Sequence, residues 1–168
     1  LSPEYDPDPI SSKRARIVMQ WNLSMIPAGA SIVNATLQLY EELSKGGPIL
    51  YSVHALNSSF DEQYVSWRAR DATHMWSVVG GDYSTEYFTN GNVDETHGWH
   101  AFDLTRLVDL WTRGVIPNYG FIIVAKDEAF DGTKSFTSSD TGNKVAQRPR
   151  LEVTYTLGQA VGTYESKP

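Results

Sequence analysis

The sequence predicts an all-β protein, an antiparallel β-sandwich of jelly-roll type with one short helix. Apolar and polar residues alternate in at least six stretches, which indicates strands with one buried and one wet face. Gly- and Pro-containing turn signals separate these stretches. Alternating strand and helix patterns, which a parallel sheet would require, do not occur.

The strands are predicted in chain order from this alternation. The first follows Arg16, where Ile17, Met19 and Trp21 fall on one face. The clearest alternation covers residues 33–39 and ends before the turn signal at 45–48. Further strands are predicted at 49–55, 98–102, 134–138 and 151–155. A continuous apolar run predicts one more, central strand at 121–125.

One helix is predicted after the fourth of these strands. Its apolar residues have the spacing i, i+3, i+4, i+7, at Leu104, Leu107, Val108 and Trp111. Asp103 or Thr105 can cap its start and Gly114 can end it. By contrast, residues 57–95 are irregular and predict long loops with at most one short strand or helix.

The 168 residues suit one domain with one core. We expect an N-terminal arm or linker at 1–12, the sandwich at 13–157 and a tail or linker at 158–168. Such flanks suggest a module of a larger multidomain protein. The longest apolar run, at 120–125, is too short to insert into a membrane.

The composition excludes several kinds of chemistry. The net charge of −6 provides no basic field for nucleic acid. Because the chain has no cysteine, disulfides, thiolate catalysis and Cys-ligated zinc are excluded. No nucleophile elbow, phosphate-binding loop or His-Glu-x-x-His motif occurs, so no catalytic residue is predicted.

Several stretches resemble one known family in the same order. The resemblance rests on RIVMQWNLSMIPAGA at 16–30, NATLQLY at 34–40, FDEQYVSW at 60–67, WHAFDLT at 99–105 and RPRLEVTY at 148–155. Trp76 followed by GGDY at 80–83 matches a loop common in the same proteins. Together they resemble the DNRLRE, or disaggregatase-related, domains over about residues 16–156.

This resemblance implies a jelly-roll module of secreted or cell-surface proteins. Some similar domains are carbohydrate-binding modules of family 96, which accompany alginate lyases and other polysaccharide-degrading enzymes. The chain departs from the family at 136–140, where FTSSD lacks the signature arginine, and it also lacks a clear first strand before Arg16. The sheet edge and any site near Asp140 are therefore not implied by the resemblance.

Aromatic residues are the first candidates for a binding site, because ring faces stack on the C–H faces of sugars. Trp76, Tyr83 and Tyr87 gather around a Gly-rich loop, and Trp99 opens a predicted strand. The alternative for Trp76 is that it packs the loop against the sandwich.

Arg68 and Arg70 could bind the carboxylates of a uronic-acid polymer, since guanidinium groups bind carboxylates through two parallel hydrogen bonds. Ion pairing with Asp61, Glu62 or Asp71 is the alternative.

A structural calcium ion is a further expectation, because hard cations bind clustered oxygen ligands in turns. The candidate ligands are Asp82, Asp127 and Asp131. Asp131 is followed by Gly132, and such an Asp-Gly pair is also a plain turn signal.

The sequence therefore predicts a secreted or surface, non-catalytic module that binds a polysaccharide. Anionic polymers such as alginate or pectin are among the candidate ligands. A structural or adhesive surface domain is the first alternative. A jelly-roll polysaccharide lyase is the second, since Tyr, His and Arg side chains are present but no motif assembles them.

Overall fold

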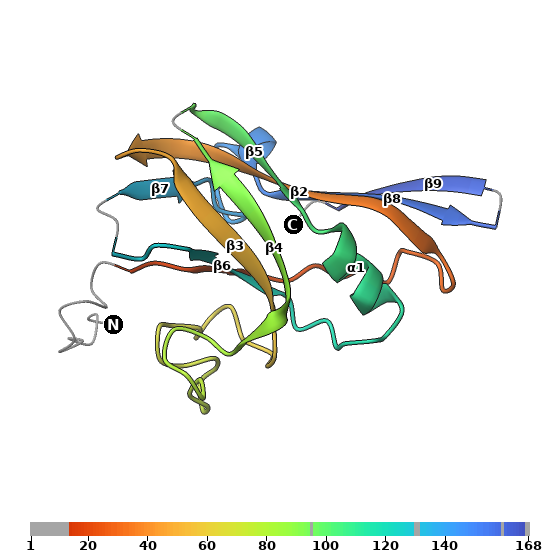
Figure 1. Cartoon of the computed structure of the whole chain (residues 1–168), viewed down its shortest axis with the longest axis horizontal. Coiled ribbons are helices and arrows are strands. Elements are labelled where there is room, and N and C mark those ends of the chain that lie inside the picture. The colour runs from red at the N-terminus through yellow and green to blue at the C-terminus, as the bar shows by residue number, and fades with distance from the viewer. Residues whose placement is uncertain (1–13, 95, 130–131, 159, 167–168) are drawn as a thin grey trace.

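The computed structural model describes residues 14–94, 96–129, 132–158 and 160–166. Strands make up 46% of the chain and form two antiparallel sheets, with one α-helix, so the predicted β-sandwich is confirmed (Figure 1). The jelly-roll type stays a prediction. The expected arm at 1–12 lies outside the described residues.

The first sheet has four strands in the order β1-β6-β3-β4. They span Ile17–Met19, Phe121–Ala125, Ile49–Leu56 and Tyr83–Val93 respectively. The two outer strands, β1 and β4, are the edges of this sheet.

The second sheet has the order β5-β2-β8-β9, and β7 also pairs with β2. Its strands span Gly98–Asp103, Ser31–Lys45, Arg150–Leu157, Ala160–Ser166 and, for β7, Thr133–Phe136. The long β2 is shared, because β8 pairs with its first half and β7 with its second half.

The main core lies between the sheets, and the alternation of β2 shows how it forms. Ala35, Leu37 and Leu39 are fully buried, while the residues between them face outward. On the first sheet, Val53 and Ile123 meet them from the other side of the core. Trp21, just after β1, stacks on Phe121 at 5.6 Å and closes one end of this core.

The helix α1 spans Thr105–Thr112 and packs against β2 and β4. Leu107, Val108 and Trp111 are buried, as their spacing predicts. The N-cap is Leu104 rather than either predicted residue, and the Thr105 amide donates to Asp103 Oδ1 at 2.9 Å. The observed N-cap therefore lies one residue after Asp103 and one residue before Thr105. The short 3-10 turn Val145–Gln147 precedes β8.

Two elements differ from the sequence prediction. The 11-residue strand β4 lies in the stretch expected to be mostly loops; its inward positions include Thr89 and Gly91, so no apolar alternation marks it. Gly91 is needed there because a Cβ at this position would clash with the ring of Phe102. The tail expected from residue 158 instead contributes β9, which pairs with β8. The sandwich therefore continues to Ser166.

A second apolar cluster lies on the outer face of the first sheet. The loop at 57–82 folds over β6, where Ile122 and Val124 are buried against Trp76 and Leu56. This explains the continuous apolar run of β6, since its inner side faces the main core and its outer side faces the loop.

Candidate functional site

An exposed aromatic and cationic group lies on the outer face of the second sheet. Tyr40 of β2 is paired with Trp99 of β5, and the two rings meet edge to face at 5.3 Å. Arg150 of β8 is paired with Gln38, two residues before Tyr40 on the same face. We call Tyr40, Trp99 and Arg150 the ring platform.

The ring platform is partly open to solvent, with Tyr40 and Arg150 half-buried. Trp99 is 38% exposed, and the Arg150 guanidinium lies 3.9 Å from its ring centroid. Such stacking orients a guanidinium flat on a ring and leaves its edge donors free. Within the described residues, Arg150 Nε is buried and has no hydrogen-bond partner. The platform can therefore offer an apolar ring and a positive charge to one ligand.

Negative charge lies at the other end of the same face. Asp103 and Glu152 both pair with Thr36, which is two residues from Gln38 along β2. The face is thus positive near Trp99 and negative near Thr36. A carboxylate-bearing ligand would place that group toward Arg150.

Sequence reasoning identified Trp99 and missed Tyr40 and Arg150. The signal was present, because buried Leu39 and Leu151 place Tyr40 and Arg150 on the outward positions of their strands. The sequence did not reveal that β5, β2 and β8 are neighbours.

Trp76 is not available as a stacking ring. It is 5% exposed, packs against β6, and donates from its indole Nε1 to the Ser66 carbonyl at 3.0 Å. Trp76 was expected to be an exposed stacking ring, and its burial corrects this expectation. The Gly80-Gly81 turn follows the ring and brings the loop down onto the sheet; a Cβ at Gly80 would lie 2.6 Å from the Arg16 guanidinium.

The two candidate tyrosines are half-buried and point to different parts of the fold. Tyr83 packs with the second apolar cluster and lies 4.7 Å from the His54 ring. Tyr87 packs against the main core, and the Arg106 guanidinium lies 5.8 Å from its ring. The structure does not bring either of them into the ring platform with Trp99.

The candidate arginines lie in the loop over the first sheet, away from the ring platform. Arg70 Nη1 donates to the Ser59 carbonyl at 3.1 Å and lies 3.5 Å from Asp71 Oδ2. The ion-pair alternative with Asp71 is thus confirmed for Arg70. The carbonyl of Arg68, an exposed residue, accepts a hydrogen bond from the Trp76 amide at 2.8 Å.

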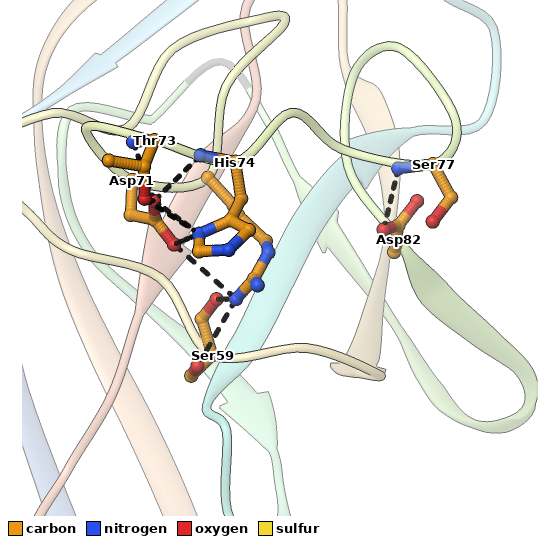
Figure 2. Close-up of polar contacts among 7 residues, drawn as sticks. Ser59, Asp71, Thr73, His74, Ser77 and Asp82 are labelled. Carbon is orange, nitrogen blue, oxygen red and sulfur yellow. Dashed lines mark hydrogen bonds and ion pairs between the residues drawn. The ribbon is translucent and has the colours of Figure 1, made fainter.

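Asp71 organises the tip of this loop (Figure 2). Its carboxylate accepts hydrogen bonds from the amides of Thr73 and His74, both at 2.8 Å, and from the Thr73 hydroxyl at 3.0 Å. The backbone donor of Thr73 and the contact with the His74 ring hold the pKa of Asp71 well below its usual range. The Asp71 carboxylate therefore stabilises the turn at residues 71–74.

The calcium candidates do not form a ligand set within the described part of the chain. Both Asp82 oxygens accept backbone amides, from Ser77 at 2.8 Å and Val78 at 2.7 Å, as Figure 2 shows for Ser77. Asp127 Oδ1 accepts the Ala129 amide at 2.9 Å. Asp131 lies outside the described residues. The described residues also contain no cluster of three or more acidic or His side chains suited to a metal ion.

A groove of about 840 Å³ runs along the free edge of β1, and we call it the edge groove. One wall is residues 17–21, and the other is residues 136–140 with Arg148 and Pro149. Phe60 and Glu62 close it at the loop side. The six residues predicted to bind carbohydrate lie elsewhere.

The comparisons with known proteins place this fold in a family. No curated protein matches the chain. No described helix has the length and apolar character needed to cross a membrane. A family model described as the disaggregatase related repeat domain matches residues 8–153, which is most of the chain. With this match over both sheets, the chain belongs to the disaggregatase-related repeat domain family.

Proposed function

We propose that this protein is a non-catalytic module that binds a polysaccharide through the ring platform. The observation that carries the proposal is the exposed Trp99 ring beside the Arg150 guanidinium on the outer face of the second sheet. A sugar ring stacks on an aromatic ring through its C–H face, while its hydroxyls bond to neighbouring polar groups. Gln38 of β2 lies between β5 and β8, and its side-chain amide can form such hydrogen bonds.

Arg150 favours an anionic polysaccharide, in which every sugar carries a carboxylate. A guanidinium binds a carboxylate through two parallel hydrogen bonds, and stacking on Trp99 holds it in place. The acidic pair Asp103 and Glu152 at the far end of the face would repel a second carboxylate there. The bound stretch is therefore short.

The wider setting follows from the same proposal. A non-catalytic binding domain acts by holding an attached enzyme or cell-surface protein close to the polysaccharide. We therefore propose that the chain belongs to a secreted or surface multidomain protein. A structural or adhesive domain is the alternative, and the burial of Trp76 favours it because this ring serves packing.

Affinity electrophoresis in gels that contain alginate, polygalacturonate or a neutral cellulose derivative tests the proposal. We expect the acidic gels to retard the wild-type protein. Trp99→Ala should weaken retardation about tenfold or more, the scale of one lost ring contact. Arg150→Gln should weaken it on the acidic gels alone.

Phe88→Ala is the matched control, because Phe88 is equally exposed, at 38%, on the outer face of the other sheet. It should migrate as the wild type does in every gel. Migration of the wild-type protein that no polysaccharide changes would contradict the proposal and leave the structural alternative.

A further inference from the structure

The core of the sandwich is incompletely covered at the edge groove. Ile17 and Met19 of β1 and Phe136 at the end of β7 all pack against the main core, yet each is only half-buried. Along β1, pairing to β6 occupies one side of the strand. Its other side faces the groove without a partner strand in the described sheet.

An unpaired strand edge beside apolar side chains is a surface that another strand can extend. A strand added there forms main-chain hydrogen bonds with β1, and every second side chain enters the groove. Edge strands are normally protected from such pairing, and the short length of β1 limits it to a few residues. The groove therefore suits a short extended peptide.

The charges at the rim narrow the choice of peptide. Glu62 and Asp140 are exposed carboxylates on the groove lining, and no hydrogen bond or ion pair engages either carboxylate within the described residues. The one basic lining residue, Arg148, keeps its positive charge, and its Nε and Nη2 donate to the Thr141 carbonyl at 3.2 and 2.8 Å. Two carboxylates against one guanidinium leave the described groove lining with a net negative charge.

We propose that the edge groove binds an extended peptide segment of another polypeptide, with alternating apolar and basic side chains, as an added strand beside β1. The apolar side chains cover Ile17, Met19 and Phe136. The basic side chains pair with Glu62 and Asp140 at the rim. The chain's own residues 1–13 have the wrong charge for this role, because they carry Glu4, Asp6 and Asp8 against Lys13.

The test uses the full chain and two fluorescently labelled hexapeptides, acetyl-(Lys-Val)3-amide and acetyl-(Glu-Val)3-amide. Each spans roughly 20 Å when extended, at about 3.3 Å per residue. Fluorescence anisotropy should show that the Lys-Val peptide binds about tenfold or more tightly than the Glu-Val peptide. Amide hydrogen exchange should slow in residues 17–19 when the Lys-Val peptide is bound.

Two double variants separate this site from the general attraction between an acidic protein and a basic peptide. Glu62→Lys with Asp140→Lys should reverse the preference between the peptides. Glu86→Lys with Glu165→Lys makes the same change in net charge at exposed positions away from the groove, and should keep the wild-type preference.

Three results would overturn the inference: neither peptide binds, both double variants behave alike, or the peptide binds while exchange at residues 17–19 stays unchanged. Protection of residues 17–19 by a neutral oligosaccharide in place of the peptide would assign the groove to a glycan and overturn it as well.

Discussion

Nε2 of His100 lies 2.8 Å from Oε2 of Glu41, and both side chains are buried inside the sandwich. Glu41 follows Tyr40 on β2, and His100 follows Trp99 on β5, so this pair lies on the opposite face of the strands that carry the ring platform. Lys134 of β7, whose side chain is fully buried, lies with its Nζ 3.5 Å from Glu41 Oε1. A buried carboxylate beside two basic groups thus lies on the inner face of β2, opposite the ring platform.

Replacement of Lys134 by Met should destabilise the fold strongly. The variant removes the ammonium group beside Glu41 and leaves His100 as the remaining basic contact of this carboxylate among the described residues. Breaking a buried pair from one side costs about 3–5 kcal/mol. Urea denaturation measures the free energy of unfolding. The exposed Lys45→Met is the control and should stay within about 0.5 kcal/mol of the wild type. A small loss in Lys134→Met would show that the contact with His100 is enough to stabilise the buried Glu41 carboxylate.

Replacement of Arg16 by Lys should also destabilise the protein, although it keeps the charge. Arg16 donates to both Glu128 oxygens, at 2.7 and 2.8 Å, and lies 4.8 Å from the Trp67 ring centroid. Burial works against the guanidinium, yet the hydrogen bond and charge of Glu128 raise the pKa of Arg16 overall. Lysine cannot make the paired contact, so we expect a loss of about 1–3 kcal/mol.

Arg113→Lys is the matched control for Arg16. Its guanidinium pairs with Asp109 at 2.7 Å but is 56% exposed, and exposed pairs contribute about 0–1 kcal/mol. Urea denaturation measures the free energy of unfolding of both variants. Equal losses would contradict the role of the paired hydrogen bonds between Arg16 and Glu128.

Trp76→Ala should loosen the loop at 57–82 while leaving the ring platform intact. The change removes a buried ring and its bond to Ser66, a loss on the order of 3–5 kcal/mol for a large core side chain. Limited trypsin digestion should become faster at Arg68 and Arg70. Met75→Ala, at a side chain that is 69% exposed, should digest as the wild type does. Loss of polysaccharide retardation in a folded Trp76→Ala protein would contradict the placement of the site at Trp99.

The raised pKa of Tyr51 predicts that the protein loses stability at alkaline pH. Burial and the charge of Glu41 raise the pKa of Tyr51 to about 12, above its usual value near 10 in an unfolded chain. The stabilisation by this group is therefore complete below pH 10 and is lost as the pH rises from about 10 to 12. Its size is on the order of 2–3 kcal/mol, at 1.36 kcal/mol per pKa unit.

The measurement compares Tyr51→Phe with the wild type in urea at pH 9 and at pH 11.5. The variant lacks the hydroxyl, so the stability difference between the two proteins should shift in favour of the variant at the higher pH. An identical difference at both values would show that the Tyr51 hydroxyl ionises normally in the fold.

Asp82→Ala tests the turn role of this carboxylate against calcium binding. The change removes two acceptors for the amides of Ser77 and Val78, and should cost roughly 1–3 kcal/mol. The loss should be the same in calcium chloride and in EDTA. A loss of stability that appears in calcium chloride but not in EDTA would indicate that Asp82 binds calcium.

The local sequence determined much of this fold. Period-two alternation placed Leu37 and Leu39 in the core and Gln38 outside, because strand side chains alternate between faces. The 3.6-residue spacing of Leu107 and Trp111 placed the helix. The same alternation marked Tyr40 and Arg150 as outward residues.

The tertiary structure decided where these residues meet. Strand order brought Tyr40, Trp99 and Arg150 together across three strands, although they are far apart in the chain. The fold of the 57–82 loop onto β6 buried Trp76, which its Gly-rich setting had suggested was exposed. Alternation reports which face of a strand is buried, but neighbours across a sheet and cover by a loop depend on long-range contacts that no local pattern records.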